Sequence, residues 1–336
     1  SLNSEMMNYI EKNHRLTNIR FYYDDLLHFS DYMPVHDKEG KDTLWLNVYY
    51  PEFEHAEIEA NLNKIYTLLH SDGDVDVLPF LKVDSIHFCT FGNSKPFRIR
   101  VRNILNDNYT NFYIKKADAS RIYGLELEEI LSPNRINFLL YKDTLIEEHI
   151  LGIPGDVFIE KHLDQCSPQE KAQIAKEFVK FNERCLIGLL GDMRSYNYVV
   201  IPAHDFDQVV YRIRPIDFDQ QCYEGNLKIY LPQYFKENKK MVEMVYDRLK
   251  PNSIEQYRKE VRSAIAKRAS TDGRLPHLLE IMKRDEISKP EHVEELKAGL
   301  HKLTYSIQFK KCESMGEILE TGLNFVIRNY NNSNVR

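Results

Sequence analysis

One stretch of the sequence carries acidic, amide and basic side chains at short intervals. Residues 190–200 read LGDMRSYNYVV, and residues 214–219 read RPIDFD. The residues between these motifs predict a β-hairpin of two strands. Because Asp192 and Asn197 lie five residues apart on a loop, both side chains can face one cavity. The returning strand of the hairpin then brings Asp217 beside Asn197.

This combination of side chains fits one kind of chemistry. Phosphoryl transfer from a metal-bound nucleotide needs a carboxylate that orients the attacking hydroxyl, an amide and a carboxylate that hold Mg²⁺, and a cation at the transferring phosphate. The stretch contains all of these groups, with Arg194 as the cation. Asp and Asn side chains also commonly cap turns. We therefore interpret Asp192, Asn197 and Asp217 either as a phosphoryl-transfer site or as turn-capping residues.

At these residues the chain resembles the protein-kinase-like superfamily, and more closely its aminoglycoside-phosphotransferase and phosphoinositide-kinase branches. Their catalytic loops read Gly-Asp-x-x-x-x-Asn, and their metal motif often reads Ile-Asp-Phe. The resemblance covers about residues 83–230 by motif. It implies that Asp192 is the catalytic carboxylate, that Asn197 is a magnesium ligand and that Asp217 is the main magnesium ligand. Arg194 stands where protein kinases place a Lys that contacts the transferring phosphate.

Several departures from the family pattern bear on this resemblance. The loop over the phosphates would be residues 91–95 (FGNSK), with one glycine where protein kinases have three. Lys95 is the candidate that compensates for this weak phosphate loop. Asp219 replaces the glycine after Asp-Phe and is a candidate second metal ligand. Leu190-Gly191 replaces the His-Arg pair of regulated protein kinases, and no Ala-Pro-Glu follows, so we expect no activation segment switched by phosphorylation.

The segment before residue 130 supplies candidates for nucleotide binding. Residues 112–115 (FYIK) look like the third-strand motif whose Lys binds the α- and β-phosphates, which points to Lys115. The following helix carries Glu126 and Glu129, three residues apart on one face, as its ion-pair partner, and we favour Glu126. Strand phase alone decides between Lys115 and its neighbour Lys116, and a solvated Lys on an edge strand is the alternative. The two glutamates could equally form a solvated helix face.

A further candidate is the segment that joins the two predicted lobes. Residues 157–162 (VFIEKH) look like the strand that enters the hinge of the family fold. In that case backbone groups around Glu160 and His162 would bond adenine. These two residues complete the predicted nucleotide-binding set.

The order of the predicted elements supports the same organisation. Strands are predicted at 85–91, 97–104, 111–116, 144–151 and 156–162, with one inserted helix at 119–131, and a second strand pair at 198–201 and 209–216. The capping-box sequence Ser-Pro-Gln-Glu at 167–170 opens a long helix, and the pattern from residue 231 onward is almost entirely helical.

The predicted fold class is therefore α+β. We expect a two-lobed protein-kinase-like fold with a small antiparallel-sheet lobe that contains one inserted helix, and a larger, mostly helical lobe. The predicted domains are 1–80, an N-terminal extension with one amphipathic helix, 81–163, the kinase-like N-lobe, and 164–336, the helical C-lobe with the catalytic hairpin.

The amino-acid composition disfavours several other classes of protein. The chain is 43% hydrophobic and 29% charged, which favours a globular protein over a disordered one. Its 51 acidic and 45 basic residues give a net charge of −6, so we expect no broad cationic face for nucleic acid. The five cysteines lie far apart and read as reduced thiols. No apolar run reaches the roughly 20 residues of a membrane span, and a cytoplasmic location is expected by default.

The sequence thus predicts an ATP- and Mg²⁺-dependent phosphotransferase that acts on a hydroxyl of an unidentified small-molecule or protein acceptor. Asp192 and Arg194 are the predicted catalytic residues. The alternative is a catalytically inactive kinase-like module, a pseudokinase, that binds a nucleotide or a partner. The single glycine of the phosphate loop and Leu190-Gly191 favour this alternative, whereas the complete set of Asp192, Asn197 and Asp217 counts against it. Transfer of AMP in place of phosphate is a third possibility.

Overall fold

The computed structural model describes residues 2–334, which form two compact units. The first unit comprises the residues up to Asp118 together with Ile136–His149. The second unit comprises Ala119–Arg135 together with the residues from Ile150 onward. This division differs from the predicted domains, because the first 80 residues join the sheet unit and the inserted helix joins the helical unit.

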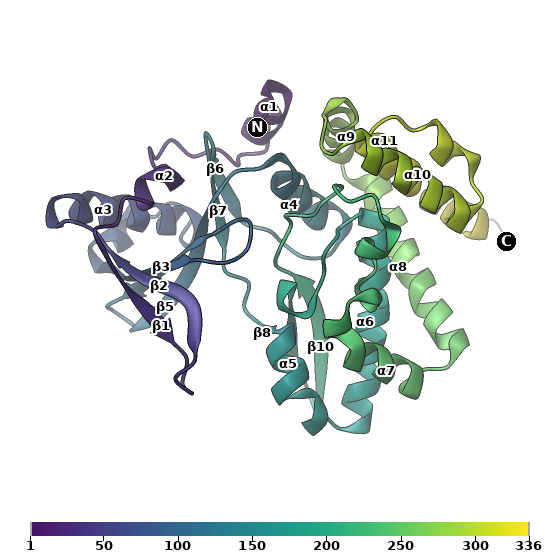
Figure 1. Cartoon of the computed structure of the whole chain (residues 1–336), viewed down its shortest axis with the longest axis horizontal. Helices are drawn as coiled ribbons and strands as arrows, with labels where there is room; N and C mark the ends of the chain where they lie inside the picture. Colours follow the sequence, from purple (N-terminus) through teal and green to yellow (C-terminus); the bar gives the residue numbers. More distant parts are fainter. Residues whose placement is uncertain (1, 335–336) are drawn as a thin grey trace. The chain divides into compact units, whose positions relative to one another are not determined.

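A seven-stranded antiparallel sheet forms the centre of the first unit (Figure 1). In spatial order the strands are β1 (Asp31–His36), β2 (Asp42–Tyr49), β3 (Leu81–Cys89), β4 (Phe97–Asn103), β5 (Asn108–Lys116), β7 (Thr144–Glu148) and β6 (Phe138–Tyr141). The helices of this unit are α1 (Ser4–Lys12), α2 (Tyr23–Leu26), α3 (Glu52–His70) and the 3₁₀ helix η1 (Val75–Phe80).

Apolar and polar residues alternate along the central strands, so the two faces of the sheet differ in character. Phe97 and Ile99 of β4 are fully buried and belong to one hydrophobic cluster with Leu62 and Ile65 of α3. Because successive side chains of a strand point to opposite faces, Arg98 lies on the face away from this cluster. The sheet therefore has one apolar face covered by α3 and one face that carries polar side chains.

The hairpin β1–β2 explains why residues 1–80 are not a separate extension. Strand β2 pairs with β3, with Trp45 opposite Cys89, so the hairpin continues the sheet. Strand β1 forms the outer edge, where the pairing register shifts between Pro34 and His36. The sheet thus gains two strands that the sequence pattern did not reveal.

The second unit is mostly helical and contains a small sheet (Figure 1). Its sheet has the order β10 (Gln208–Pro215), β9 (Tyr198–Asp205) and β8 (Ile153–Pro154). Its α-helices are α4 (Ala119–Leu131), α5 (Gly155–Lys161), α6 (Pro168–Gly188), α7 (Lys239–Arg248), α8 (Pro251–Thr271), α9 (Leu275–Arg284), α10 (Pro290–Thr304) and α11 (Met315–Asn334). Helix α6 packs against β10, α7 and α8, and α4 packs against α8 and α9.

Helix α6 begins where the capping-box sequence predicts. The hydroxyl of Ser167 accepts a hydrogen bond from the Glu170 amide over 3.1 Å, and the Glu170 carboxylate accepts one from the Ser167 amide over 2.7 Å. Pro168 occupies the first helical position, where its missing N–H costs nothing. At the other end Leu189 adopts a left-handed conformation with φ of 52°, which ends the helix and turns the chain into the loop that contains Asp192.

The predicted strand over 156–162 is wrong, because helix α5 occupies Gly155–Lys161. Pro154 precedes the helix, and Asp156 lies in its first turn, where an acidic side chain is favoured by the helix dipole. Gly155 allows this helix to approach the loop after Asp192, since a Cβ at this position would lie 2.3 Å from the carbonyl oxygen of Ser195. The apolar run Val-Phe-Ile indicated a strand, but these local contacts favour the helix.

The predicted fold class, α+β, is confirmed. The structure contains an antiparallel sheet, a helix inserted between β5 and β6 and a mostly helical remainder, and this arrangement is consistent with a two-lobed kinase-like fold. Within residues 2–334, no helix combines the length and the apolar character that crossing a membrane requires.

Candidate functional site

The loop between α6 and the 3₁₀ helix η3 (Ser195–Asn197) carries Asp192 in an unusual backbone conformation. Asp192 has φ of 61°, which is in the left-handed region that Asp tolerates better than most residues. Its amide donates to the carbonyl of Ile229 over 3.1 Å, and its own carbonyl accepts from the Arg194 amide over 2.8 Å. The loop is therefore fixed at its centre by the segment that follows β10.

Asn197 lies next to Asp192, as the five-residue spacing predicts. The side-chain nitrogen of Asn197 donates to the backbone carbonyl of Asp192 over 2.8 Å and lies 3.5 Å from its carboxylate. Because the amide nitrogen faces Asp192, the amide oxygen of Asn197 points to the other side. That oxygen is a hard ligand of the type that Mg²⁺ prefers.

The hairpin brings the metal motif alongside Asn197. Strands β9 and β10 pair so that Tyr198 lies opposite Pro215, and the amide of Ile216 donates to the carbonyl of Asn197 over 3.0 Å. Asp217 follows directly, and its carboxylate accepts from the Asp219 amide over 2.9 Å. The hydrogen bonds along this hairpin therefore place Asn197 and the start of the Asp217-Phe218-Asp219 turn side by side.

Arg194 bridges two carboxylates. Its Nε donates to Oδ1 of Asp192 over 2.7 Å, and its Nη1 donates to Oε1 of Glu237 over 3.2 Å. Its guanidinium carbon lies 4.6 Å from the centre of the Phe235 ring, within the range of a cation–π contact. The predicted cation of the site is thus held beside the predicted catalytic carboxylate.

Asp219, the predicted second metal ligand, already has a cationic partner. Nε of Arg121 on α4 lies 2.5 Å from Oδ1 of Asp219, and both side chains are largely buried. One turn further along α4, a Cβ at Gly124 would lie 2.8 Å from Cβ of Phe218. Helix α4 therefore contacts the metal motif through an ion pair and through a close approach that a glycine permits.

Glu126 and Glu129 on α4 both face Arg274, the N-cap residue of α9. Oε1 of Glu129 lies 2.7 Å from Nη1 of Arg274, and Oε2 of the fully buried Glu126 lies 4.0 Å from the same nitrogen. Hydrogen bonds to Asp272 and Glu129 hold the pKa of Arg274 above its ordinary value. The glutamates are therefore not a solvated helix face. Lys115 belongs to the other unit, and its pairing with Glu126 or Glu129 stays a prediction.

In the sheet unit, the structure distinguishes Lys115 from Lys116. Nζ of Lys115 lies 3.0 Å from Oε2 of Glu147 on β7, and both residues are buried. Lys116 is exposed and pairs with Asp24 and Asp143 over 2.7 and 3.0 Å. Strand β5 lies between β4 and β7, so Lys115 is an inner residue of the sheet and not a solvated edge Lys.

The sheet face of Lys115 carries other polar and aromatic side chains. Arg98 on β4 lies 2.8 Å from Nδ1 of His87 on β3, and its guanidinium stacks on Trp45 at 4.4 Å. Burial lowers the pKa of His87 to about 4, with Arg98 and Arg100 contributing. Arg98 therefore lies between the ring of Trp45 and an imidazole whose protonation is disfavoured.

The remaining predicted nucleotide ligands lie in exposed positions. Lys95 is exposed in the loop after β3, and its carbonyl accepts from the hydroxyl of Tyr23 over 2.7 Å. Glu160 and His162 lie on the exposed side and at the end of α5. The amide of His162 is bonded to the carbonyl of Phe158 over 2.9 Å, so the strand-like hinge from which these two residues would bond adenine does not exist.

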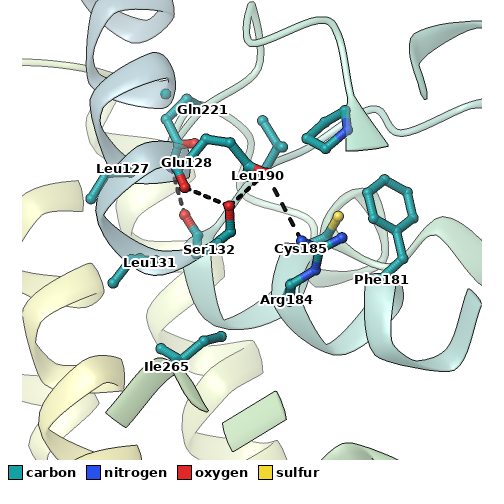
Figure 2. Close-up of a pocket in the computed structure, with 13 residues that line it drawn as sticks. Leu127, Glu128, Leu131, Ser132, Phe181, Arg184, Cys185, Leu190, Gln221 and Ile265 are labelled. Carbon is teal, nitrogen blue, oxygen red and sulfur yellow. Dashed lines mark hydrogen bonds and ion pairs between the residues drawn. The ribbon is translucent and has the colours of Figure 1, made fainter. Parts of the chain in front are cut away.

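Two cavities of the second unit are lined by residues other than these. Figure 2 shows the smaller one, about 30 Å³, where Oε1 of Glu128 accepts from Ser132 over 3.1 Å and Leu190 forms part of the wall. A cavity of this size holds about one water molecule. A larger cavity of about 730 Å³ is bordered by helices α6, α8, α10 and α11. The linings of both cavities contain none of the predicted site residues.

Sequence patterns did not identify three residues of the site: Glu237, Tyr196 and Arg121. Tyr196 is half-exposed, and burial raises the pKa of its hydroxyl, with Arg194 opposing and the carboxylates of Asp192, Glu237 and Asp217 adding. This phenol therefore lies within the electrostatic field of all three acids. Glu237 and Arg121 belong to no motif, and Tyr196 occupies an unspecified position of the Gly-Asp-x-x-x-x-Asn pattern, so only their tertiary position reveals them.

The residues fit a magnesium ion of the kind that also binds phosphate. Mg²⁺ is usually held by one or two carboxylates together with phosphate oxygens and water. Asn197 and Asp217 supply an amide and a carboxylate oxygen at adjacent strand ends. Among residues 2–334, no group of three or more His, Cys, Asp or Glu side chains forms a protein-only metal centre. Asn197 and Asp217 therefore offer two oxygen ligands of the kind that Mg²⁺ uses.

The sequence and the structure were compared with known proteins. No family model matches the sequence, and no curated protein matches it. Among solved structures, an ethanolamine kinase of Plasmodium vivax is similar over 79% of this chain and 89% of that chain, with 11% sequence identity and a TM-score of 0.30. A TM-score of this size carries no argument about activity or substrate, and the functional case therefore depends on the geometry of the site.

Proposed function

We propose that this protein is an ATP- and Mg²⁺-dependent phosphotransferase that acts on a hydroxyl of an acceptor. The observation that carries the proposal is the junction of Asp192 with Asn197, at 2.8 Å to the backbone and 3.5 Å to the carboxylate, next to the start of the metal motif. Turn capping alone does not require the carboxylate of Asp192 and the start of the metal motif to lie beside the same side chain, that of Asn197. The simpler interpretation as turn-capping residues is therefore less favoured.

The proposed roles follow from position and charge. Asp192 orients the acceptor hydroxyl and accepts its hydrogen bond, because its carboxylate is the group at the centre of the loop. Arg194 offsets negative charge on the phosphoryl group during transfer. Asn197 and Asp217 would hold Mg²⁺, and Asp219 is a further candidate that also pairs with Arg121. Bound Mg²⁺ would neutralise charge on the nucleotide phosphates.

The proposed nucleotide contacts come mainly from the sheet unit. Lys115 is the candidate for the non-transferred phosphates, since it is a buried cation on an inner strand, where it contacts Glu147. Lys95 in the loop after β3 is an exposed candidate for the same phosphates. Glu126 and Glu129 stay candidate partners of Lys115. Glu160 and His162 are left out, because they lie on a helix and at its end.

A binding module without transfer activity is the second candidate function. One observation favours it: both acids that would serve catalysis beside Asp217 are ion-paired, Asp192 with Arg194 and Asp219 with Arg121. In a pseudokinase such pairs would be permanent. In an enzyme the substrate or the metal must displace them. The two candidates therefore differ in whether nucleotide binding is followed by turnover.

The deciding experiment compares wild type with Asp192→Asn in two measurements. Asn tolerates the left-handed conformation of residue 192, so the loop should keep its shape. ATP with Mg²⁺ should raise the melting temperature of both proteins equally, because Asp192 acts on the acceptor. ATP turnover, to water or to an acceptor, should fall about 100- to 10,000-fold in the variant. Nucleotide binding with equal turnover in both proteins, or with none in either, would favour the binding module.

A further inference from the structure

The segment after β10 forms a support for the loop that carries Asp192. Asn238 is fully buried, and its side-chain nitrogen donates to the carbonyls of Met193 and Pro232 over 3.0 and 2.9 Å. Its side-chain oxygen accepts from the hydroxyl of Tyr198 over 2.7 Å. These three bonds fix the preceding residue, Glu237, against the loop. The fold therefore fixes the position of Glu237 beside this loop.

Among the described residues, only one of the two carboxylate oxygens of Glu237 accepts a hydrogen bond. Its Oε1 accepts from Nη1 of Arg194 over 3.2 Å. Its Oε2 is buried and has no hydrogen-bond partner among residues 2–334. A buried carboxylate oxygen without a donor costs free energy, because it has lost its water and gained nothing in return. A nearby donor that can reach this oxygen would therefore stabilise the carboxylate.

The neighbouring guanidinium can supply the missing donor. Arginine and a carboxylate commonly pair as a fork, with two parallel hydrogen bonds that use both carboxylate oxygens. In the structure Arg194 makes one bond to Glu237 through Nη1 and one bond to Asp192 through Nε. A turn of the guanidinium toward Glu237 would bring Nη2 to Oε2 and complete the fork.

We propose that the Arg194 side chain has two alternative positions, here called seats, and that Glu237 forms the second. In the first seat Arg194 covers Oδ1 of Asp192. In the second seat it forms the fork with Glu237 and leaves Oδ1 of Asp192 to the acceptor hydroxyl. The Phe235 ring, 4.6 Å from the guanidinium carbon, supports the guanidinium plane close to both acids. This inference rests on the proposed function, and it makes Glu237 a positioning residue that acts through Arg194.

The first test is structural and needs no activity. In a crystal structure of Asp192→Asn, residue 192 has lost the charge that holds Arg194 in the first seat. We expect Nη1 and Nη2 of Arg194 to lie within hydrogen-bond distance of Oε1 and Oε2 of Glu237. The proposal is overturned if Arg194 keeps Nε on residue 192 and Oε2 stays without a donor.

The second test is kinetic. Glu237→Gln should lower kcat about tenfold and leave KM for ATP within about twofold. The reason is that the second seat of Arg194 frees Asp192 for the acceptor hydroxyl after the nucleotide has bound. Adding Glu237→Gln to Arg194→Met should change kcat by less than about twofold, since Glu237 has then lost the residue through which it acts. Glu243→Gln is the matched control, because Glu243 is an exposed acid on α7 that pairs only with Lys239 among the described residues.

These outcomes distinguish a failure of the proposed role of Glu237 from a failure of the proposed phosphotransferase function. A further tenfold loss in the Arg194→Met background, or an effect on KM alone, would show that Glu237 does not act through Arg194. If the wild type transfers no phosphate to any acceptor or to water, the proposed function fails, and the crystal structure of Asp192→Asn still decides whether the second seat exists. If Glu237→Gln does not fold, that structure again gives the deciding result.

Discussion

Arg121 and Asp219 form an ion pair in which Nε lies 2.5 Å from Oδ1, although the two residues are 98 positions apart in the sequence. The pair joins helix α4 to the turn that carries the proposed metal ligands. Asp219 therefore differs from an unpaired metal ligand, because the guanidinium of Arg121 already forms an ion pair with one of its carboxylate oxygens.

Replacing Arg121 should destabilise the protein and increase its response to metal. The side chains of Arg121 and Asp219 are 11% and 14% exposed, so Arg121→Met should lower the free energy of unfolding by about 3 kcal/mol. ATP with Mg²⁺ should raise the melting temperature of the variant more than that of wild type, because a metal ion can take over the lost charge. Equal increases in the two proteins would place Asp219 outside the metal site. Thermal unfolding with and without Mg²⁺ measures this.

Adding one methyl group at Gly124 should disturb the metal motif. A Cβ at this position would lie 2.8 Å from Cβ of Phe218, which is buried and cannot swing away. Gly124→Ala should therefore cost about 1–3 kcal/mol of stability and weaken Mg²⁺-dependent ATP binding. Gly188→Ala is the matched control, since a Cβ there meets nothing within 4 Å. The close approach is unimportant if the two variants unfold at the same denaturant concentration.

The two adjacent lysines of β5 should respond differently to the same change. Lys115→Met removes a buried cation from Glu147 and should both destabilise the sheet unit and weaken ATP binding about tenfold or more. Lys116→Met removes exposed ion pairs and should change the free energy of unfolding by about 0.5 kcal/mol or less. Isothermal titration with ATP and Mg²⁺ gives the affinities. Equal affinities for both variants would exclude Lys115 as a phosphate ligand.

The stability of the sheet unit should fall in mildly acidic solution. The folded protein lowers the pKa of His87 to about 4, against an ordinary value of about 6.5. Because the unfolded chain binds this proton more readily, stability is full above about pH 6.5 and is lost as the pH falls toward 4. His87→Gln should make this decline shallower. Urea unfolding between pH 4.5 and 7.5 tests it, and an unchanged slope would show that His87 does not contribute.

Local signals in the sequence predicted several of the elements that carry the candidate site. The capping box of Ser167 and Glu170 predicted the start of α6, and the bounds of α4 agree with the predicted helix because Ser-Pro follows it. The hairpin between Asn197 and Asp217 was likewise predicted from two β-rich runs. Each of these features depends on neighbours in the sequence, which is why pattern alone suffices.

Other features depend on partners that lie far along the chain. Arg274 is 145 residues from Glu129, and no pattern links them. The strand predicted over 156–162 is a helix because Gly155 packs against the backbone of Ser195. The contact between Glu237 and Arg194 follows from the fixed position of Asn238. These contacts are set by packing, and apolar periodicity contains no information about them.

The hairpin β1–β2 also has a consequence for how the chain behaves in solution. The outer strand β1 contains Pro34, which offers no backbone N–H, and its register shift breaks the regular row of hydrogen-bonding groups. Such an edge is a poor template for pairing with another molecule. A chain shortened to begin after residue 50 would instead expose the long edge of β3, where Trp45 now faces Cys89. We expect such a fragment to aggregate through that edge.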